Sequence, residues 1–119
     1  MVQAFKNGDG AYFGIVIDSI YIGEIALDAI YTNTQSANVC YWISEQQQGK
    51  GFAKTALLHL KNWSKSNTHL DYLEIRMKAS NYSSEKVAIS AGAVLVNTTP
   101  LSANSEQTES TIKEYHLKL

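Results

Sequence analysis

The chain has 119 residues, of which 45% are hydrophobic, and ten basic against eleven acidic side chains leave a formal charge of −1. This length fits one domain with its own core, so we expect a single domain over residues 1–119. The charge balance argues against nucleic-acid binding, and no apolar run is long enough to cross a membrane. A single cysteine forms no internal disulfide, and residues 1–6 do not resemble a signal peptide, so we expect a cytoplasmic protein.

The first third of the chain predicts three strands. Residues 7–10 are turn formers, and no strand or helix is predicted before them. Residues 12–17 and 21–30 are rich in β-branched and aromatic side chains and are expected to form a hairpin, while a third strand is expected at 38–43.

The middle of the chain predicts a helix and then a strand. A helix from residue 52 to about 66 places Leu57, Leu60 and Trp63 on one face. In the strand at 73–79, apolar residues at the odd positions are expected to be buried, and Glu74, Arg76 and Lys78 are expected to face solvent.

The last third predicts one more helix and two strands. Asn81 is a good N-cap for a helix that runs to about residue 91, and Gly92 suits the position after its end. A strand begins at Val94 and is stopped by Pro100, residues 101–110 are expected to form a mobile loop, and 111–119 alternates as a strand.

This order of elements, β-β-β-α-β-α-β-β, indicates the fold class. It predicts an α/β (α+β) fold in which a mixed, largely antiparallel central sheet has helices packed on its faces.

A glycine loop between the third strand and the first helix is the strongest functional signal. Gly49 and Gly51 allow positive φ and close approach of a ligand, and the helix that follows points free N–H groups at the same spot, which favours a phosphate. Two common phosphate motifs do not match. A dinucleotide fingerprint needs glycine where the chain has Lys54, and a P-loop needs glycine where it has Ala53.

Two motifs in this chain resemble those of one superfamily. Gln48-x-x-Gly51-x-Ala53 resembles the acetyl-CoA-binding motif of the GCN5-related N-acetyltransferases (GNAT). The segment Asn81-x-x-Ser84-x-x-Val-Ala, followed by Gly92, resembles its RimJ/RimL-like branch. The resemblance spans residues 12–119 and implies a GNAT-like fold that is N-terminally short, because the strand and two helices that usually precede residue 12 are not expected here.

The resemblance also implies residue roles. Backbone amides of the loop would bind the pyrophosphate of acetyl-CoA, the end of the third strand would pair with the pantetheine arm, and a strand N–H would polarise the thioester carbonyl. The implied cofactor-binding residues are Tyr41, Trp42, Ile43, Gln48, Gly49, Lys50, Gly51, Phe52, Ala53, Lys54, Asn81 and Ser84.

The sequence specifies the catalytic groups less closely than the cofactor-binding residues. Many relatives use a tyrosine acid where this chain has Ala88. In the RimL-like pattern the serine of Asn-x-x-Ser is the proposed donor, so the resemblance implies Ser84 as the proton donor to the leaving thiolate. Glu24 and Glu45 are the candidate bases, although neither matches a family base. Cys40 is expected to be a small buried residue. No metal site is expected, because the three histidines lack ligand spacing.

The sequence therefore predicts an acetyl-CoA-dependent N-acetyltransferase. The acetyl group would pass through a tetrahedral intermediate directly to a primary amine, either a protein N-terminal α-amine or a small-molecule amine, with no nucleic-acid or membrane partner. The alternative is a non-catalytic acyl-CoA-binding or interaction module derived from a truncated acetyltransferase. A homodimer is expected, because absent N-terminal helices would leave apolar surface for a second copy to cover.

Overall fold

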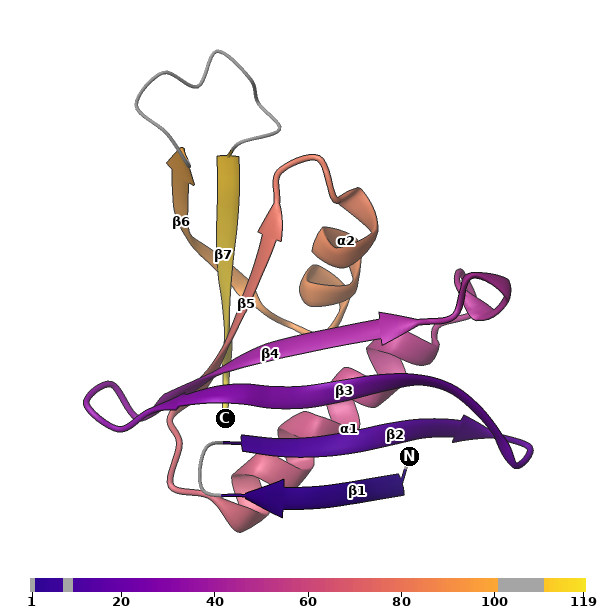
Figure 1. Ribbon diagram of the computed structural model, residues 1–119. Coiled ribbons are helices and arrows are strands. Elements are labelled where there is room, and N and C mark those ends of the chain that lie inside the picture. Colours follow the sequence, from indigo (N-terminus) through magenta and orange to yellow (C-terminus); the bar gives the residue numbers. More distant parts are fainter. Residues whose placement is uncertain (1, 8–9, 101–110) are drawn as a thin grey trace.

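The computed structural model of the chain describes residues 2–7, 10–100 and 111–119, so the loop predicted at 101–110 lies outside the described residues. Its described strands form one seven-stranded sheet in the order β1-β2-β3-β4-β5-β7-β6 (Figure 1). The strands are β1 (Val2–Asn7), β2 (Gly10–Ile17), β3 (Ile20–Tyr31), β4 (Ser36–Ile43), β5 (Tyr72–Lys78), β6 (Val94–Pro100) and β7 (Thr111–Lys118). The helices are the short 3₁₀ turn η1 (Glu45–Gln47), α1 (Phe52–Asn67) and α2 (Tyr82–Ser90).

The predicted mixed, largely antiparallel sheet is confirmed. Among the described strands, β4 and β5 are the one pair of neighbours that run parallel, and α1 connects them. The predicted elements from residue 12 onward are all present, with their ends moved by a few residues. Neither α1 nor α2 is long and apolar enough to be a candidate membrane span.

The expectation that no strand precedes residue 12 is wrong. β1 pairs antiparallel with β2, from Val2 opposite Gly14 to Asn7 opposite Gly10. The last described pair, Asn7 opposite Gly10, lies within the turn-forming cluster of the sequence, so this cluster follows a strand. β1 has six residues and lies at an edge of the described sheet, so its sequence offers only a short pattern to recognise.

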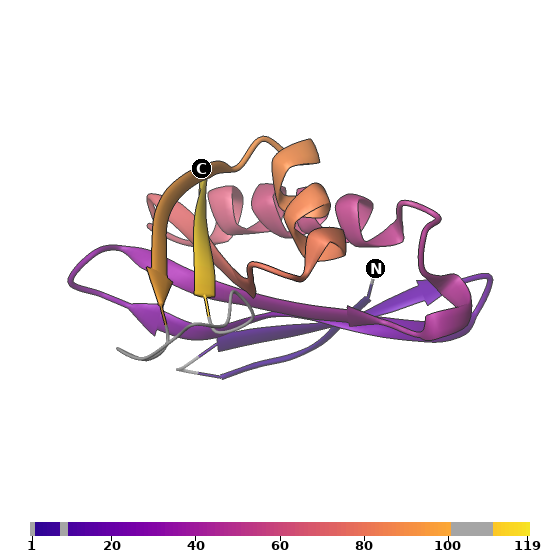
Figure 2. The ribbon, with the colours of Figure 1, turned by 90° about the horizontal axis from the view of Figure 1, so that it is seen from above.

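Both helices pack on the same face of the sheet (Figure 2). Leu57 and Leu60 of α1 are fully buried there, as the spacing predicts, and the half-buried Trp63 meets Phe13 edge to face at 5.1 Å between ring centroids. Side chains that alternate with this core point to the other face, which we call the open face. It carries, among others, Trp42 and Arg76.

Glu74 departs from the prediction for β5. Its neighbours in the strand alternate as expected, but Glu74 is only 5% exposed rather than solvated. The cause is its place in a central strand, where Asn38 of β4 and His116 of β7 stand on either side of it. Arg76 forms an ion pair with the Glu74 carboxylate and compensates its buried charge.

The feature of the fold that creates a site is the divergence of β4 from β5. The two strands pair only from Ser36 opposite Tyr72 to Val39 opposite Ile75. Beyond that point β4 continues alongside β3, β5 continues alongside β7, and the two run apart (Figure 1). The end of β4 therefore has a strand neighbour on one side only.

Candidate functional site

A cavity of about 630 Å³ lies where β4 and β5 have separated. We call it the first cavity. Its lining comes from the end of β4, the loop after it, the start of α1 and the start of α2. The lining residues are Tyr41, Trp42, Ile43, Gln47, Gln48, Gly49, Gly51, Phe52, Ala53, Lys54, Asn81, Ser83, Ser84, Lys86 and Val87.

The loop from β4 to α1 has the geometry of an anion cradle. Gly49 and Gly51 have φ of 77° and 82°, which L side chains rarely adopt, and a Cβ on either would point into open space. Gly51 is the N-cap of α1 and provides no side-chain cap. Within the described residues, no intramolecular acceptor is found for the main-chain N–H groups of residues 49–54. These donors are available to a phosphate, and Lys54 adds positive charge.

Gln48 fixes the loop to the strand that precedes it. Its side-chain Nε2 donates to the main-chain oxygen of Ile43 at 2.9 Å, and its main-chain N–H donates to Glu45 at 3.3 Å. Gln48 therefore shapes the cradle through the protein, while the nearby Lys50 donates to the side chain of Gln47 at 3.2 Å and does not line the cavity.

The first turn of α2 forms the wall opposite β4. Asn81 caps the helix as predicted, because its side-chain oxygen accepts from the N–H of Ser84 at 3.2 Å. Tyr41 of β4 reaches across the gap, and its hydroxyl donates to the main-chain oxygen of Ser84 at 3.5 Å. The hydroxyl of Ser84 has no partner among the described residues, so it is available to a ligand in the cavity.

A second cavity, of about 350 Å³, adjoins the first. It is lined partly from the open face, by side chains that include Asn38, Cys40 and Arg76. Both cavities are bounded by Tyr41, Asn81 and Ser84. A molecule in the first cavity and a molecule in the second therefore come together at the gap between the strands.

The expectation that Cys40 is buried is wrong. It follows the buried Val39 in β4, so its side chain points to the open face and is exposed. Partial desolvation, and then the nearby Asp28, raise the pKa of its thiol to about 11. A thiol with this pKa stays protonated near neutral pH, which disfavours a nucleophilic role.

Glu85, the residue after Ser84, ties α2 to β7. Its Oε2 accepts from Tyr115 Oη at 2.6 Å and from Lys113 Nζ at 2.8 Å. These hydrogen bonds lower the pKa of the Glu85 carboxyl, and they raise the pKa of Tyr115 from 10.0 to about 12. We call these three residues the Glu85 clasp.

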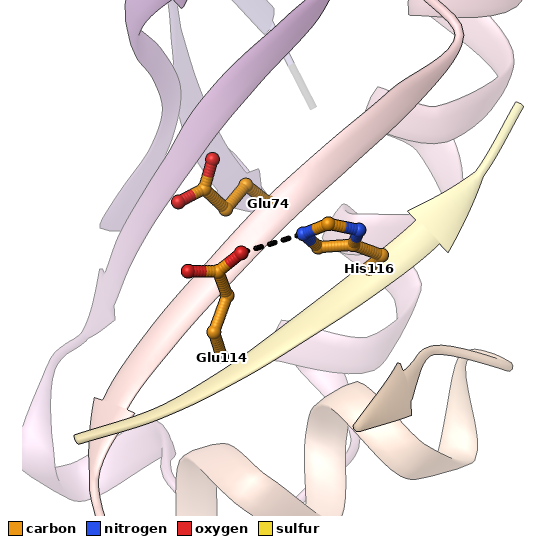
Figure 3. A group of neighbouring side chains, drawn as sticks. All are labelled: Glu74, Glu114 and His116. Carbon is orange, nitrogen blue, oxygen red and sulfur yellow. Dashed lines mark hydrogen bonds and ion pairs between the residues drawn. The ribbon is translucent and has the colours of Figure 1, made fainter. Parts of the chain in front are cut away.

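An ion-pair network lies on the open face beside the second cavity (Figure 3). Glu114 points at His116, with 2.6 Å between Oε2 and Nε2, and Glu74 lies beside them. Arg76 contacts both carboxylates, at 3.3 Å for Glu114. Arg76 contacts both acidic groups, and its guanidinium would repel a cation, which disfavours a metal ion at this cluster.

The structure brings together most of the predicted cofactor-binding residues. All of them except Lys50 line the first cavity. The two candidate bases line neither cavity: Glu45 lies in η1, and Glu24 lies on the open face, where it accepts from Tyr21 at 3.2 Å and stands opposite Trp42. The sequence analysis missed Gln47, Ser83, Lys86 and Val87. The last three could have been predicted from helical periodicity, since they share the first turns of α2 with Ser84.

Comparisons with known proteins point to one family. The family model of the acetyltransferase (GNAT) domain matches residues 1–94. Among curated proteins, the ribosomal-protein-serine acetyltransferase of Escherichia coli (strain K12) is 28% identical over 94 residues, which are 79% of this chain and 52% of that protein. The chain thus spans about half the length of this relative.

Solved acetyltransferases have a similar fold. RimL, a ribosomal alpha-N-protein acetyltransferase in complex with coenzyme A, superposes with a TM-score of 0.84 at 19% identity, over 94% of this chain and 63% of that one. Microcin C7 self immunity acetyltransferase MccE, in complex with acetyl-CoA and AMP, superposes at 0.80 and 18% identity, over 93% and 62%. A spermidine N-acetyltransferase, SpeG from Vibrio cholerae, superposes at 0.81 and 19% identity, over 94% and 67%.

The Glu85 clasp predicts how stability changes with pH. The folded-state pKa of Tyr115 lies above its ordinary value of 10.0, so the contact stabilises the fold below about pH 10, and the stabilisation is lost as the pH rises toward 12. We expect the Tm difference between the wild type and Tyr115→Phe to be constant between about pH 7 and 9 and to shrink above about pH 10. In a Glu85→Gln background, which removes the acceptor's charge, this pH dependence should be much weaker. A Tm difference that grows above pH 10 in the wild-type background would contradict the assignment.

Proposed function

The chain belongs to the acetyltransferase (GNAT) domain family, and from that premise we propose that it binds acetyl-CoA in the first cavity and transfers the acetyl group to a primary amine. The observation that carries this proposal is the row of unpartnered main-chain N–H groups at residues 49–54, at the point where β4 separates from β5. The N–H groups of the cradle and the unpaired edge of β4 suit the two ends of one ligand. The cradle favours a pyrophosphate, and the edge of β4 favours an extended chain that contains amides.

The residues of the first cavity fit such a ligand. The positions where Gly49 and Gly51 lack a Cβ face open space, so a phosphate approaches the main chain closely there. Lys54 and Lys86 line the same cavity and supply charge for phosphate oxygens. Alternate residues of β4 direct N–H and C=O groups away from β3, and beyond Val39 these groups lack a strand partner and suit the amides of a pantetheine arm.

The acetyl group arrives activated as a thioester, so the chain's residues have two tasks at the gap. One is to polarise the carbonyl, and we assign this to a main-chain N–H of β4 near Tyr41. The other is to protonate the departing sulfur as the C–S bond breaks, and we assign this to the Ser84 hydroxyl, which borders both cavities and would regain its proton from the amine nitrogen of the tetrahedral intermediate.

The acceptor amine is proposed to enter from the second cavity, which shares the gap. A protein N-terminal α-amine is favoured, since the curated relative is described as a ribosomal-protein-serine acetyltransferase. An α-amine has a pKa of about 7.7–8.0, so a sizeable fraction is neutral at physiological pH and needs little help from a base. An acceptor that needs little help from a base is consistent with the two cavities, because neither Glu24 nor Glu45 lines them. The competing acceptor is a small amine, as in the spermidine N-acetyltransferase of similar fold.

A second candidate function is binding of acyl-CoA without transfer. The observation that favours it is the same absence of both predicted carboxylates from the two cavity linings. The two functions differ in turnover and share the cofactor site.

The cradle is tested by comparing two glycines with similar backbone strain. Gly51→Ala and Gly92→Ala both place a side chain at positive φ, 82° and 99°, and each should cost about 1–2 kcal/mol of stability. Only Gly51 lines the first cavity, so Gly51→Ala alone should weaken CoA binding, by about tenfold or more, through loss of amide contacts to phosphate. The measurement is calorimetric titration with CoA, supported by thermal shift, where CoA at ~100 times its dissociation constant should stabilise the wild type by about 2.7 kcal/mol. Equal losses of CoA affinity in both variants would refute the proposal that the loop around Gly51 binds the phosphates of CoA.

Transfer is tested with Ser84→Ala. Because thiolates leave readily, we expect its kcat to fall by roughly 10², at the low end of general-acid effects, with CoA affinity within about threefold of wild type. Ser90→Ala, on the exposed end of α2 where its hydroxyl donates to Val87, is the matched control and should keep wild-type rates. Thiol release is measured with a peptide that begins with serine, the same peptide with a blocked α-amine, and spermidine. Tight CoA binding without thiol release from any acceptor would favour the binding module.

We also propose that two copies associate through β6, which lies at the opposite edge of the described sheet from β1. Every residue of β6 is exposed, Val94, Leu95 and Val96 among them, and no charged residue occurs from Val87 to Pro100. Antiparallel pairing of β6 with itself about Leu95 would place Val94 opposite Val96 and would satisfy main-chain groups that pair with no other described strand. Light scattering should give twice the chain mass for the wild type and the monomer mass for Leu95→Lys. A monomeric wild type at concentrations of about 100 μM would exclude this pairing.

A further inference from the structure

Helix α2, which carries Ser84, has few apolar anchors. It is nine residues long, and Ala88 is its one fully buried residue. Val87 is half-buried, while Tyr82 and Ile89 are 74% and 55% exposed. So short a helix with one small buried side chain is not held in place by packing alone.

The Glu85 clasp supplies the missing anchor. Its two contacts, at 2.6 and 2.8 Å, are short and join the start of α2 to two residues of β7 that face the same side of the sheet. Tyr115 is only 4% exposed, with its ring in the core, so its hydroxyl is a fixed point. Lys113 adds a charge-assisted contact to the same carboxylate oxygen.

The clasp acts on the turn that borders both cavities. Glu85 donates its main-chain N–H to the oxygen of Asn81 at 3.2 Å, and Asn81 in turn accepts from the N–H of Ser84 at 3.2 Å. On the β4 side, the same turn receives the longer 3.5 Å contact from Tyr41. The turn is therefore fixed more tightly to β7 than to β4.

We propose that Glu85 is a positioning residue, which Tyr115 and Lys113 hold so that the Ser84 hydroxyl stays at the gap between β4 and β5. The inference rests on the proposed function, because it acts through Ser84. Glu85, Lys113 and Tyr115 line neither cavity, so contact with either substrate is not their role. Without the clasp, α2 remains folded at its Asn81 cap but turns or shifts relative to β4.

The test combines the clasp with Ser84. Glu85→Gln keeps the shape and removes the charge, and Tyr115→Phe removes the donor. Each should lower kcat by about tenfold, since small misplacements of a reacting group are costly, with CoA affinity within about threefold of wild type. Lys118→Gln, an exposed change on the same strand, is the control and should leave kcat unchanged.

The Ser84→Ala background separates positioning from general stability. If Glu85 acts through Ser84, Glu85→Gln should cause no further loss of kcat in that background. An equal fold-loss in both backgrounds would overturn the proposal, because a merely structural role lowers the rate regardless of Ser84. An unchanged kcat in Glu85→Gln and Tyr115→Phe would also overturn it.

A second measurement judges the clasp if the proposed function itself fails. Should the wild type bind CoA without turnover, amide hydrogen exchange at residues 84–87 is compared in wild type, Glu85→Gln, Tyr115→Phe and Lys118→Gln. The proposal expects exchange to be at least about tenfold faster in the two clasp variants and unchanged in Lys118→Gln. Equal exchange in all four proteins would refute the positioning role. Absence of CoA binding together with fast exchange in the clasp variants would refute the proposed function alone.

Discussion

The structure depends on the short pairing between β4 and β5. Four residues of each strand pair, and then the strands separate. A parallel pair usually continues while hydrogen-bonding partners are available, and early separation leaves main-chain donors and acceptors of β4 without a strand. Those groups are kept at the gap because β4 is paired with β3 along its whole length. The proposed ligand would complete the interrupted sheet while its charged end rests on the loop that follows β4.

The hydrophobic core and the proposed site are built from the same elements. Leu57 and Leu60 fix α1 on the sheet, and this fixes the direction in which the N-terminus of α1 faces the first cavity. The strand alternation that buries Val39 and Ile75 under the helices also sends Cys40 and Arg76 to the open face, where they line the second cavity. The positions of the first and second cavities on either side of the gap therefore follow from the alternation of side chains along the strands. No additional helix or loop is needed to separate them.

Local signals in the sequence predicted much of this arrangement. The glycine loop and the Asn81 cap are local, since each depends on residues within one turn, and both are present where they were predicted. Features set by distant neighbours were not predicted correctly. Cys40 was expected to be buried, but its orientation follows from strand register, and the burial of Glu74 follows from β7, which lies about forty residues further along the chain. The contact between Glu85 and Tyr115 joins residues 30 positions apart, so no short motif contains it.

The three elements around the gap are held by different forces. β4 is held by a ladder of main-chain hydrogen bonds and α1 by a buried apolar face, and neither is changed much by one substitution at the surface. α2 is held by its cap and by one carboxylate, so single substitutions can shift it while the sheet stays folded. Since α2 borders both cavities, a shift of its first turn would change the shape of the gap, and with it the proposed acceptor side, while the rest of the fold stays in place. The part of the proposed site that single substitutions can most easily shift is thus the element with the fewest apolar contacts, while the proposed cofactor contacts lie on the more firmly held β4 and α1.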